Sequence, residues 1–274
     1  DDPMEGACMN VMKAGIEYAT KVIAVSPGYA WEMSTDEGGW GLAPTIRNDP
    51  NKISGIVNGI DFAEWSPEHD PYLQSDGYQN YNLDLEGLWT GKQACKAALQ
   101  RELGLPEDPH ACLVGFIGRL DEQKGVDLVL DSEGFLMHHH VQVVFLGSGR
   151  QDLQDRLYDM QQRNHDRVRA WIGFSNATAH RLTAAADMLL MPSRFEPCGL
   201  NQLYAMHYGT VPVVHEVGGL RDTVKHYDGF NDGTGFTFDR CDPEKLQWAL
   251  GQAFNCFHNH RESFLGVALR GMHQ

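Results

Sequence analysis

The pattern of apolar and polar positions becomes regular from Leu113 onward. Short apolar runs typical of buried strands occur at 113–117, 141–146, 168–172, 188–191 and 211–214. Segments with helix-like spacing lie between and after them, beginning near Gly125, Gln151, Ala177, Asn201 and Leu220. Strands that alternate with helices predict a parallel sheet with right-handed crossovers. The fold class predicted for this part of the chain is therefore α/β, with a Rossmann-like parallel sheet.

The pattern before Leu113 is less regular. Within residues 11–27, a segment with helical apolar spacing leads into a short strand at 22–25. From Gly28 to about Leu105 the chain is rich in Gly, Pro, Asp and Asn, with aromatic residues between them. We expect little regular structure there. The chain also shows no internal repeat of solenoid length and no low-complexity tract.

Composition and charge exclude several classes of protein. The formal net charge of −15 argues against a nucleic-acid partner, because such binding needs clustered Lys and Arg to displace counterions. No apolar run of about 18 residues occurs, so we expect no transmembrane helix and no membrane partner. The six cysteines are widely spaced without a CxxC pair, which fits a reducing compartment and indicates neither zinc nor a disulfide framework.

The most informative stretch is 192–224, which contains two strand–turn–helix units in succession. An apolar strand ends in a turn that carries Arg194, Glu196 and Gly199, and a helix pattern follows at once. In the second strand–turn–helix unit, the turn after the strand carries Gly218 and Gly219. In parallel α/β sheets ligands bind at the carboxyl ends of strands, where helix N-termini offer free N–H groups. A carboxylate there is costly to bury, so a chemical role is favoured over a structural one. Two adjacent strand–turn–helix units, one with a Glu and one with paired glycines, suit a sugar phosphate or sugar nucleotide.

These motifs resemble those of the bacterial glycogen synthases and plant starch synthases, glycosyltransferase family 5. The resemblance rests on PSRFEPCGLNQL, YGTVPVV and GGLRDTV within 192–224, and on FIGRLDEQKGVDL at 116–128. The sequence NQLYAMHYGTVPVVH, together with GWGL at 39–42 and GIVNGID at 55–61, is most similar to that of the soluble starch synthase I type. The resemblance runs along nearly the whole chain.

The resemblance implies a GT-B architecture, in which two Rossmann-like domains face a cleft. Residues 1–57 would be the end of the N-terminal domain, 58–112 the interdomain connection and the entry to the second domain, and 113–274 the nucleotide-sugar-binding domain, incomplete at its C-terminus. The family's N-terminal lysine–glycine donor motif has no counterpart here. We expect a fragment that is inactive alone, from a protein of the plastid stroma whose transit peptide lies upstream.

The implied reaction is transfer of glucose from ADP-glucose to the nonreducing 4-hydroxyl of an α-1,4-glucan, with retention and without a metal or other cofactor. A neutral glucan needs no basic patch, and an anionic donor needs only local cations. A bacterial-type glycogen synthase is an alternative within the same chemistry. The alternative from another class is a non-catalytic module that binds a nucleotide sugar or a glucan.

Arg119 and Lys124 are candidate diphosphate ligands. They lie five residues apart across a turn, just after an apolar strand, so both cations could converge on one pyrophosphate. The alternative is a solvated basic pair in a loop, which is the usual position of Lys and Arg. The family's diphosphate-binding Arg and Lys fall on these positions. They would neutralise the charge that develops on the leaving nucleoside diphosphate.

Glu196 is the candidate for catalysis at the transferred sugar. From the residues alone, an N-cap or a salt bridge to Arg194 is an equal alternative. The resemblance places Glu196 near the transferred glucose, where it would stabilise oxocarbenium-like charge. Related retaining transferases carry a second Glu eight positions on, which here is Tyr204. Retention could use Glu196 as a nucleophile, or same-face attack assisted by the leaving phosphate.

The remaining candidates would bind the donor. The N–H groups that open the helix at 201 could bind sugar hydroxyls or phosphate, although Cys198 could instead be a small apolar filler. The paired glycines would let the backbone approach the distal phosphate, and Val217 replaces the family's usual Thr before them. These donor-site candidates are Cys198, Gly199, Leu200, Asn201, Gly218 and Gly219.

Two further residues match family positions. Phe174 corresponds to the aromatic residue beside the adenine ring, although an aromatic residue after a strand is more commonly part of the core. Asn58 corresponds to a residue near the sugar, although an Asn-Gly turn is the ordinary explanation. LGSGR at 146–150 is too short for a dinucleotide fingerprint. His138–His140 could suggest a metal, but a solvated helix end is favoured because no second ligand cluster accompanies them.

Overall fold

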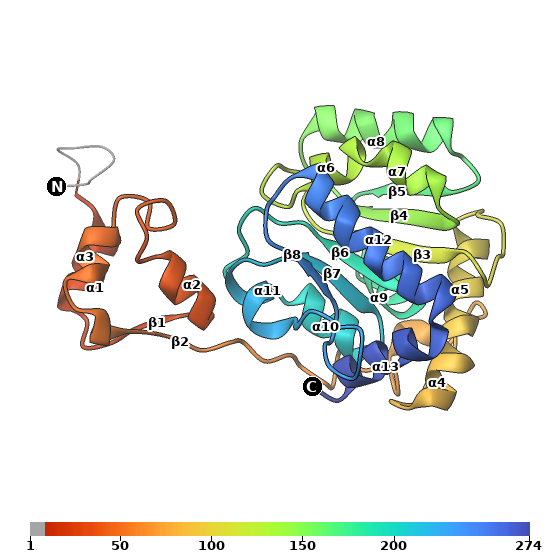
Figure 1. The fold of residues 1–274 in the computed structure, drawn as a ribbon, viewed down its shortest axis with the longest axis horizontal. Helices are drawn as coiled ribbons and strands as arrows, with labels where there is room; N and C mark the ends of the chain where they lie inside the picture. Colours follow the sequence, from red (N-terminus) through yellow and green to blue (C-terminus); the bar gives the residue numbers. More distant parts are fainter. Residues whose placement is uncertain (1–8) are drawn as a thin grey trace. The chain divides into compact units, whose positions relative to one another are not determined.

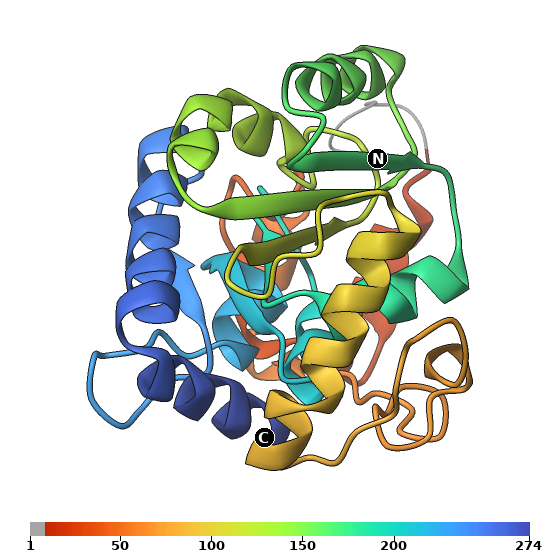
Figure 2. The ribbon, with the colours of Figure 1, turned by 90° about the vertical axis from the view of Figure 1, so that its right-hand side faces the viewer.

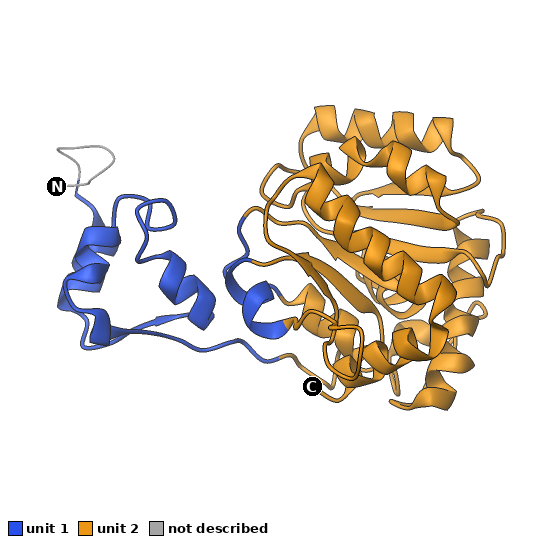
Figure 3. Ribbon diagram, viewed as in Figure 1, with its two compact units in different colours: residues 1–59, 195–199, 217–223 blue, residues 60–194, 200–216, 224–274 orange. Residues whose placement is uncertain are grey.

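The computed structural model describes residues 9–274 and divides into two units (Figures 1 and 3). The first unit comprises the chain up to Gly59 together with Phe195–Gly199 and Val217–Thr223. The second comprises Ile60–Arg194, Leu200–Glu216 and Val224–Gln274. Both units therefore contain residues from the motif-rich stretch 192–224.

The first unit is small and is built around a two-stranded parallel sheet. Its strands are β1 (Val22–Ala24) and β2 (Ile53–Gly55), and its helical segments are α1 (Val11–Tyr18), α2 (Pro27–Glu32), α3 (Ala43–Arg47), the 3-10 turn η1 (Pro50–Lys52) and α11 (Gly218–Thr223). Ser26 caps α2 by accepting a 3.0 Å hydrogen bond from the N–H of Tyr29, and Pro27 occupies the first helical position. Its core is Ile16, Leu42 and Ile46.

The second unit contains a six-stranded parallel sheet with the order β5-β4-β3-β6-β7-β8. Its strands are β3 (Cys112–Ile117), β4 (Val141–Gly147), β5 (Val168–Ile172), β6 (Met188–Met191), β7 (Val211–His215) and β8 (Phe236–Phe238). The chain first extends the sheet from β3 to β4 and β5, then returns to the other side of β3 with β6. The switch at β3 and β6 brings the loops that follow these two strands to one edge of the sheet.

Helices cover both faces of this sheet (Figures 1 and 2). The helices form two groups, one on each face of the sheet, and in the second group α5 packs against α9. The first group is α6 (Val126–Asp131), α7 (Glu133–His138), α8 (Gln151–Arg163) and α12 (Pro243–Asn259). The second is α4 (Leu85–Trp89), α5 (Gly91–Glu102), α9 (Asn176–Ala185), α10 (Asn201–His207) and α13 (Arg261–Met272). The central strands are consequently buried, except for the partly buried last residues of β3 and β4.

The irregular segment that follows Ile60 is anchored by a buried polar and aromatic cluster. Its one short helix is the 3-10 turn η2 (Pro71–Leu73). The Asp70 carboxylate accepts hydrogen bonds from Tyr208 Oη and interacts with His180 Nδ1, both at 2.7 Å. Trp65 stacks between the rings of His180 and Tyr204, at centroid distances of 3.7 and 3.9 Å. These contacts fix the loop against α9 and α10.

Two buried lysines attach α5 to the sheet. Lys96 forms a 2.7 Å ion pair with Asp187, whose carboxylate also accepts the N–H of Leu113 at 2.8 Å. Lys92 donates to the carbonyl oxygens of Ala184 and Tyr208 and to the hydroxyl of Thr210. A buried ammonium group must have such partners, because an unpaired one would be strongly destabilising.

The five strands expected from the apolar runs are all present, at or within one residue of the expected bounds. The segment 58–112 contains more regular structure than its sequence pattern indicated, because α4 and α5 lie there and belong to the second unit. The edge strand β8 was not expected. None of the helices between residues 9 and 274 is both long and apolar enough to cross a membrane.

Candidate functional site

The two candidate cations, Arg119 and Lys124, lie in the turn between β3 and α6. The guanidinium of Arg119 forms an ion pair with Asp121 at 3.0 Å and donates to Gln123 Oε1 at 2.6 Å. Asp121 also caps the turn by accepting the N–H of Lys124 at 3.0 Å. A Cβ atom added at Gly118, directly after the strand, would lie 3.7 Å from the side chain of Lys124. Both cations therefore come from one ordered turn at the carboxyl end of the sheet.

The turn after β3 is joined to the loop after β6. The N–H of Arg194 donates to the carbonyl oxygen of Gln123 at 2.8 Å, and its guanidinium forms two hydrogen bonds with Asp127, at 2.9 and 2.7 Å. The bond with Asp127 raises the pKa of Arg194. Asn201 at the start of α10 donates its side-chain N–H to the Ile117 carbonyl at 2.9 Å. The two motifs far apart in sequence thus form one continuous surface.

A glycine at position 125 is essential to this junction. Gly125 precedes α6 with a φ of 71°, in the left-handed region that side chains rarely adopt. A Cβ atom there would lie only 2.0 Å from the carbonyl oxygen of Pro192. Lys124 therefore occupies a backbone position that is fixed by the close approach of the β6 loop.

In the first unit, the Glu196 loop packs backbone to backbone against the glycine turn after β7. The carbonyl oxygen of Glu196 accepts the N–H of Gly219 at 3.0 Å. Gly218 has a φ of 44°, and a Cβ there would lie 2.1 Å from the same oxygen. The N–H of Gly218 donates to the carboxylate of Glu32 at 2.7 Å, so this amide binds an anionic oxygen. Glu196 itself is buried.

The residues that open α10 are divided between the units. Cys198 and Gly199 belong to the first, and Leu200 and Asn201 to the second. Cys198 is a buried thiol. Leu200, at the N-cap of α10, forms no side-chain cap. Tyr204, where related transferases carry a second Glu, stacks on Trp65 and supports the fold.

A cavity of about 260 Å³ lies where β3, β4 and β5 end. Arg119 lines one part of it, and Phe174 lines another. The ring of Phe174 is 90% exposed, so it is not part of the core. An exposed aromatic side chain at the rim of such a cavity is suited to stack on a planar group. The structure therefore places Phe174 and Arg119 at the same cavity.

The other candidates are not among the residues that line this cavity. Asn58 is an exposed residue in the first unit, beyond β2. His138 ends α7, His139 packs against Phe135, and His140 interacts with Asp108 at 2.7 Å. Within residues 9–274, no group of three or more His, Cys, Asp or Glu side chains could hold a metal ion. The five cysteines in this part of the chain are free thiols, and Cys8 lies outside it.

The family model "Glycosyl transferases group 1" matches residues 97–264, more than half of the chain, and "Starch synthase catalytic domain" matches residues 1–48. The chain is 56% identical to soluble starch synthase 2-3 of Oryza sativa subsp. indica, over 100% of this chain and 34% of that protein. It is 47% identical to soluble starch synthase 1 of Solanum tuberosum, over 97% of this chain and 41% of that protein.

The sequence identities with starch synthase 2 proteins thus exceed those with starch synthase 1 proteins. The motif sequences had favoured the starch synthase I type. The chain spans about a third of the length of the starch synthase 2 relatives it matches. Among solved structures, it matches the catalytic domain of starch synthase IV from Arabidopsis thaliana bound to ADP and acarbose. The TM-score is 0.87, with 36% identity over 95% of this chain and 53% of that one.

Sucrose-phosphate synthase from Thermosynechococcus elongatus shares the fold at a TM-score of 0.64 and 21% identity, over 96% of this chain and 56% of that one. The expected α/β fold of the GT-B glycosyltransferases is therefore confirmed. On the match over residues 97–264, the chain belongs to the group 1 glycosyl transferases, and its relatives at 46–56% identity are starch synthases.

Proposed function

We propose that this chain is the donor-binding part of a starch synthase, which transfers glucose from ADP-glucose to the nonreducing 4-hydroxyl of an α-1,4-glucan with retention. The observation that carries the proposal is the cavity shared by Arg119 and Phe174 at the carboxyl end of the sheet. It supplies a stacking surface for a base and a cation for a phosphate. The starch synthase IV structure, similar over 95% of this chain, contains ADP and acarbose.

In the proposed complex, Phe174 stacks on the adenine, while Arg119 and Lys124 bind the diphosphate. Arg119 would exchange its ion pair with Asp121 for the phosphate oxygens. As the bond to glucose breaks, negative charge develops on the leaving ADP, and two fixed cations stabilise that charge without reorganisation. The Gly218 and Gly219 turn would bind the distal phosphate, with the Gly218 N–H replacing its bond to Glu32.

Glu196 would stabilise the positive charge that develops on the transferred glucose. Cys198, Gly199, Leu200 and Asn201 would bind glucose hydroxyls or phosphate through backbone N–H groups. The proposal requires no metal ion, since the cations supply the charge neutralisation. By analogy with the relatives named chloroplastic/amyloplastic, we place the protein in the plastid.

The proposal is tested by assaying the full-length protein with ADP-glucose and UDP-glucose on glycogen, in the presence of EDTA. We expect incorporation of glucose from ADP-glucose that persists in EDTA. The chain of 274 residues assayed alone should not incorporate glucose. If the full-length protein bound ADP and glycogen without any transfer, the non-catalytic binding module would be the correct function.

The roles of the two cations are tested by Arg119→Ala and Lys124→Ala in the full-length protein. Charge-assisted hydrogen bonds contribute roughly 1.5–3 kcal/mol each, so each variant should lower kcat/KM for ADP-glucose by about ten- to hundredfold. Since both cations would contact one ligand, the double variant should show coupling in a mutant cycle. Glucan affinity should be unchanged. Loss of glucan binding with normal ADP-glucose binding would place the pair at the acceptor site.

A further inference from the structure

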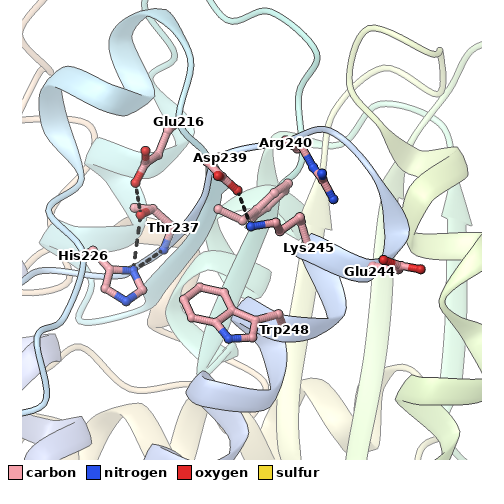
Figure 4. A pocket seen from close by; sticks show the side chains of 9 residues that line it. Glu216, His226, Thr237, Asp239, Arg240, Glu244, Lys245 and Trp248 are labelled. Carbon is pink, nitrogen blue, oxygen red and sulfur yellow. Dashed lines mark hydrogen bonds and ion pairs between the residues drawn. The ribbon is translucent and has the colours of Figure 1, made fainter.

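A second cavity, of about 590 Å³, lies in the second unit beyond the ends of β7 and β8 (Figure 4). Its volume falls within the range of about 300–1,000 Å³ found for ligand pockets. The sides are formed by Glu216 after β7, by Asp239 after β8, and by Glu244 and Trp248 from the first two turns of α12. None of these residues belongs to the proposed donor site, and only Glu216 falls within the motif-rich stretch 192–224.

Two nearly parallel aromatic rings form one wall of this cavity. Trp248 and His226 stack with an interplanar angle of 12° and a centroid distance of 5.8 Å. Trp248 is 51% exposed, although a tryptophan side chain gains more than most from burial. Figure 4 shows its ring facing the cavity from α12. The unit thus presents a flat apolar surface to the cavity.

The orientation of His226 is fixed by the backbone of β8. Its Nδ1 accepts the N–H of Thr237 at 3.0 Å, so the neutral ring carries its proton on Nε2. The hydroxyl of Thr237 donates to the carboxylate of Glu216. A hydrogen-bond chain therefore holds the ring and a carboxylate in place before any ligand binds, which lowers the entropic cost of binding.

The charges around the cavity argue against an anionic ligand. Three carboxylates line it, those of Glu216, Asp239 and Glu244. The two lining cations are engaged in ion pairs, Lys245 with Asp239 at 2.9 Å and Arg240 with Asp242 at 3.0 Å. Carboxylates accept hydrogen bonds from hydroxyl groups, and a flat aromatic ring packs on the apolar C–H face of a pyranose. The cavity therefore suits an uncharged polyhydroxylated ligand.

We propose that this cavity is a second glucan-binding site, which holds a segment of the α-1,4-glucan away from the reacting end. A pyranose ring stacks on Trp248, and its hydroxyl groups donate to Glu216 and Glu244. The choice of an α-1,4-glucan as the ligand rests on the proposed function. Such a site raises the local concentration of a polymeric acceptor without taking part in the transfer.

The test compares Trp248→Ala with Trp89→Ala in the full-length protein. Trp89 is a matched control, since it is 52% exposed and lies in α4, outside the cavity. Affinity for glycogen and maltoheptaose is measured by affinity electrophoresis and calorimetry, and ADP affinity in parallel. We expect Trp248→Ala to weaken glycogen binding by at least about tenfold, on the scale of one lost aromatic contact, with ADP affinity unchanged. Trp89→Ala should match the wild type.

Kinetics distinguish this site from the catalytic one. With maltotriose as acceptor, Trp248→Ala should keep the wild-type kcat, whereas the KM for glycogen should rise by about tenfold. Trp248→Phe should restore most of the affinity, and Glu244→Gln should lower it with little effect on folding, because Glu244 is exposed. These two variants test the site even if Trp248→Ala fails to fold.

Two results would overturn the inference. If the folded Trp248 and Glu244 variants kept the glucan affinity of the wild type, the cavity would not be a glucan site. The proposed function would be unaffected by this result, because the protein would still transfer glucose. Weakened ADP binding with unchanged glucan binding would make the cavity a nucleotide site. If the wild type transferred no glucose but lost glycogen binding on Trp248→Ala, the proposed activity would fail and this site would stand.

Discussion

At the scale of single residues, the buried Lys92 has a measurable consequence for stability. Burial lowers the pKa of Lys92 from 10.5 to about 7, and the charge of Asp187 offsets this only in part. Above pH 7 the folded protein therefore binds fewer protons at this site than the unfolded chain does. The free energy of unfolding should consequently rise with pH at this site, by up to about 1.4 kcal/mol per pH unit.

The measurement is urea denaturation of wild type and Lys92→Met from about pH 7 to about pH 8.5, a range in which the other titrating groups affect both proteins alike. The difference in unfolding free energy between wild type and Lys92→Met should grow in favour of the wild type as pH rises. Parallel pH profiles for the two proteins would mean that Lys92 keeps an ordinary proton affinity in the fold.

Some residue-level predictions could be made from the sequence and others could not. The motif after β3 identified Arg119 and Lys124, and the structure places both in one turn. The sequence could not decide what Arg194 pairs with, because Asp127 lies 67 residues earlier and only the fold brings the two together. The sequence did not indicate a binding role for Trp248, since a tryptophan in a helical pattern is ordinarily a core residue. Its exposure becomes visible only in the fold.

At the scale of secondary structure, the tight junction between the β3 and β6 loops gives a second prediction. Gly125→Ala should lower the free energy of unfolding by about 1–3 kcal/mol, because the side chain requires a left-handed conformation and meets Pro192. Gly134→Ala is the control, since Gly134 lies in α7 with open space around its Cα. It should be neutral or stabilising by up to about 1 kcal/mol.

Both variants are measured by urea denaturation. Equal effects of Gly125→Ala and Gly134→Ala would contradict the close approach of the two loops. Because Gly125 follows Lys124 directly, Gly125→Ala should also weaken ADP-glucose binding if the turn holds the diphosphate. If Gly125→Ala bound ADP-glucose as tightly as the wild type, the conformation of this turn would not affect donor binding.

The elements differed in how well the sequence predicted them. The strands β3, β4, β6 and β7 are buried on both faces, so their apolar runs are continuous and easily recognised. Helix α5 was missed because its buried face carries Lys92, Lys96 and Gln100 at spacings of four residues, which conceals the amphipathic pattern. Strand β8 was missed because it has only three residues.

At the scale of the whole molecule, the candidate residues belong to different compact units. Arg119, Lys124 and Phe174 belong to the second unit, and Glu196 and Gly218 to the first. The net charge of −15 is compatible with the proposed substrates, because an anionic donor needs only local cations and a neutral glucan needs none. The family motifs led to the choice of these candidate residues, but they could not indicate to which compact unit each belongs, because that depends on packing between segments distant in the sequence.

We propose that Glu196 acts on the transferred glucose in an ADP-glucose-dependent transferase. This role is tested most directly by steady-state kinetics of Glu196→Gln in the full-length protein, with ADP affinity measured by calorimetry. Gln keeps the size of Glu and removes its charge. We predict that kcat falls by at least about a hundredfold, as for the loss of one preorganised electrostatic group, while ADP binds as tightly as to the wild type. Near-normal turnover in this variant would contradict the account.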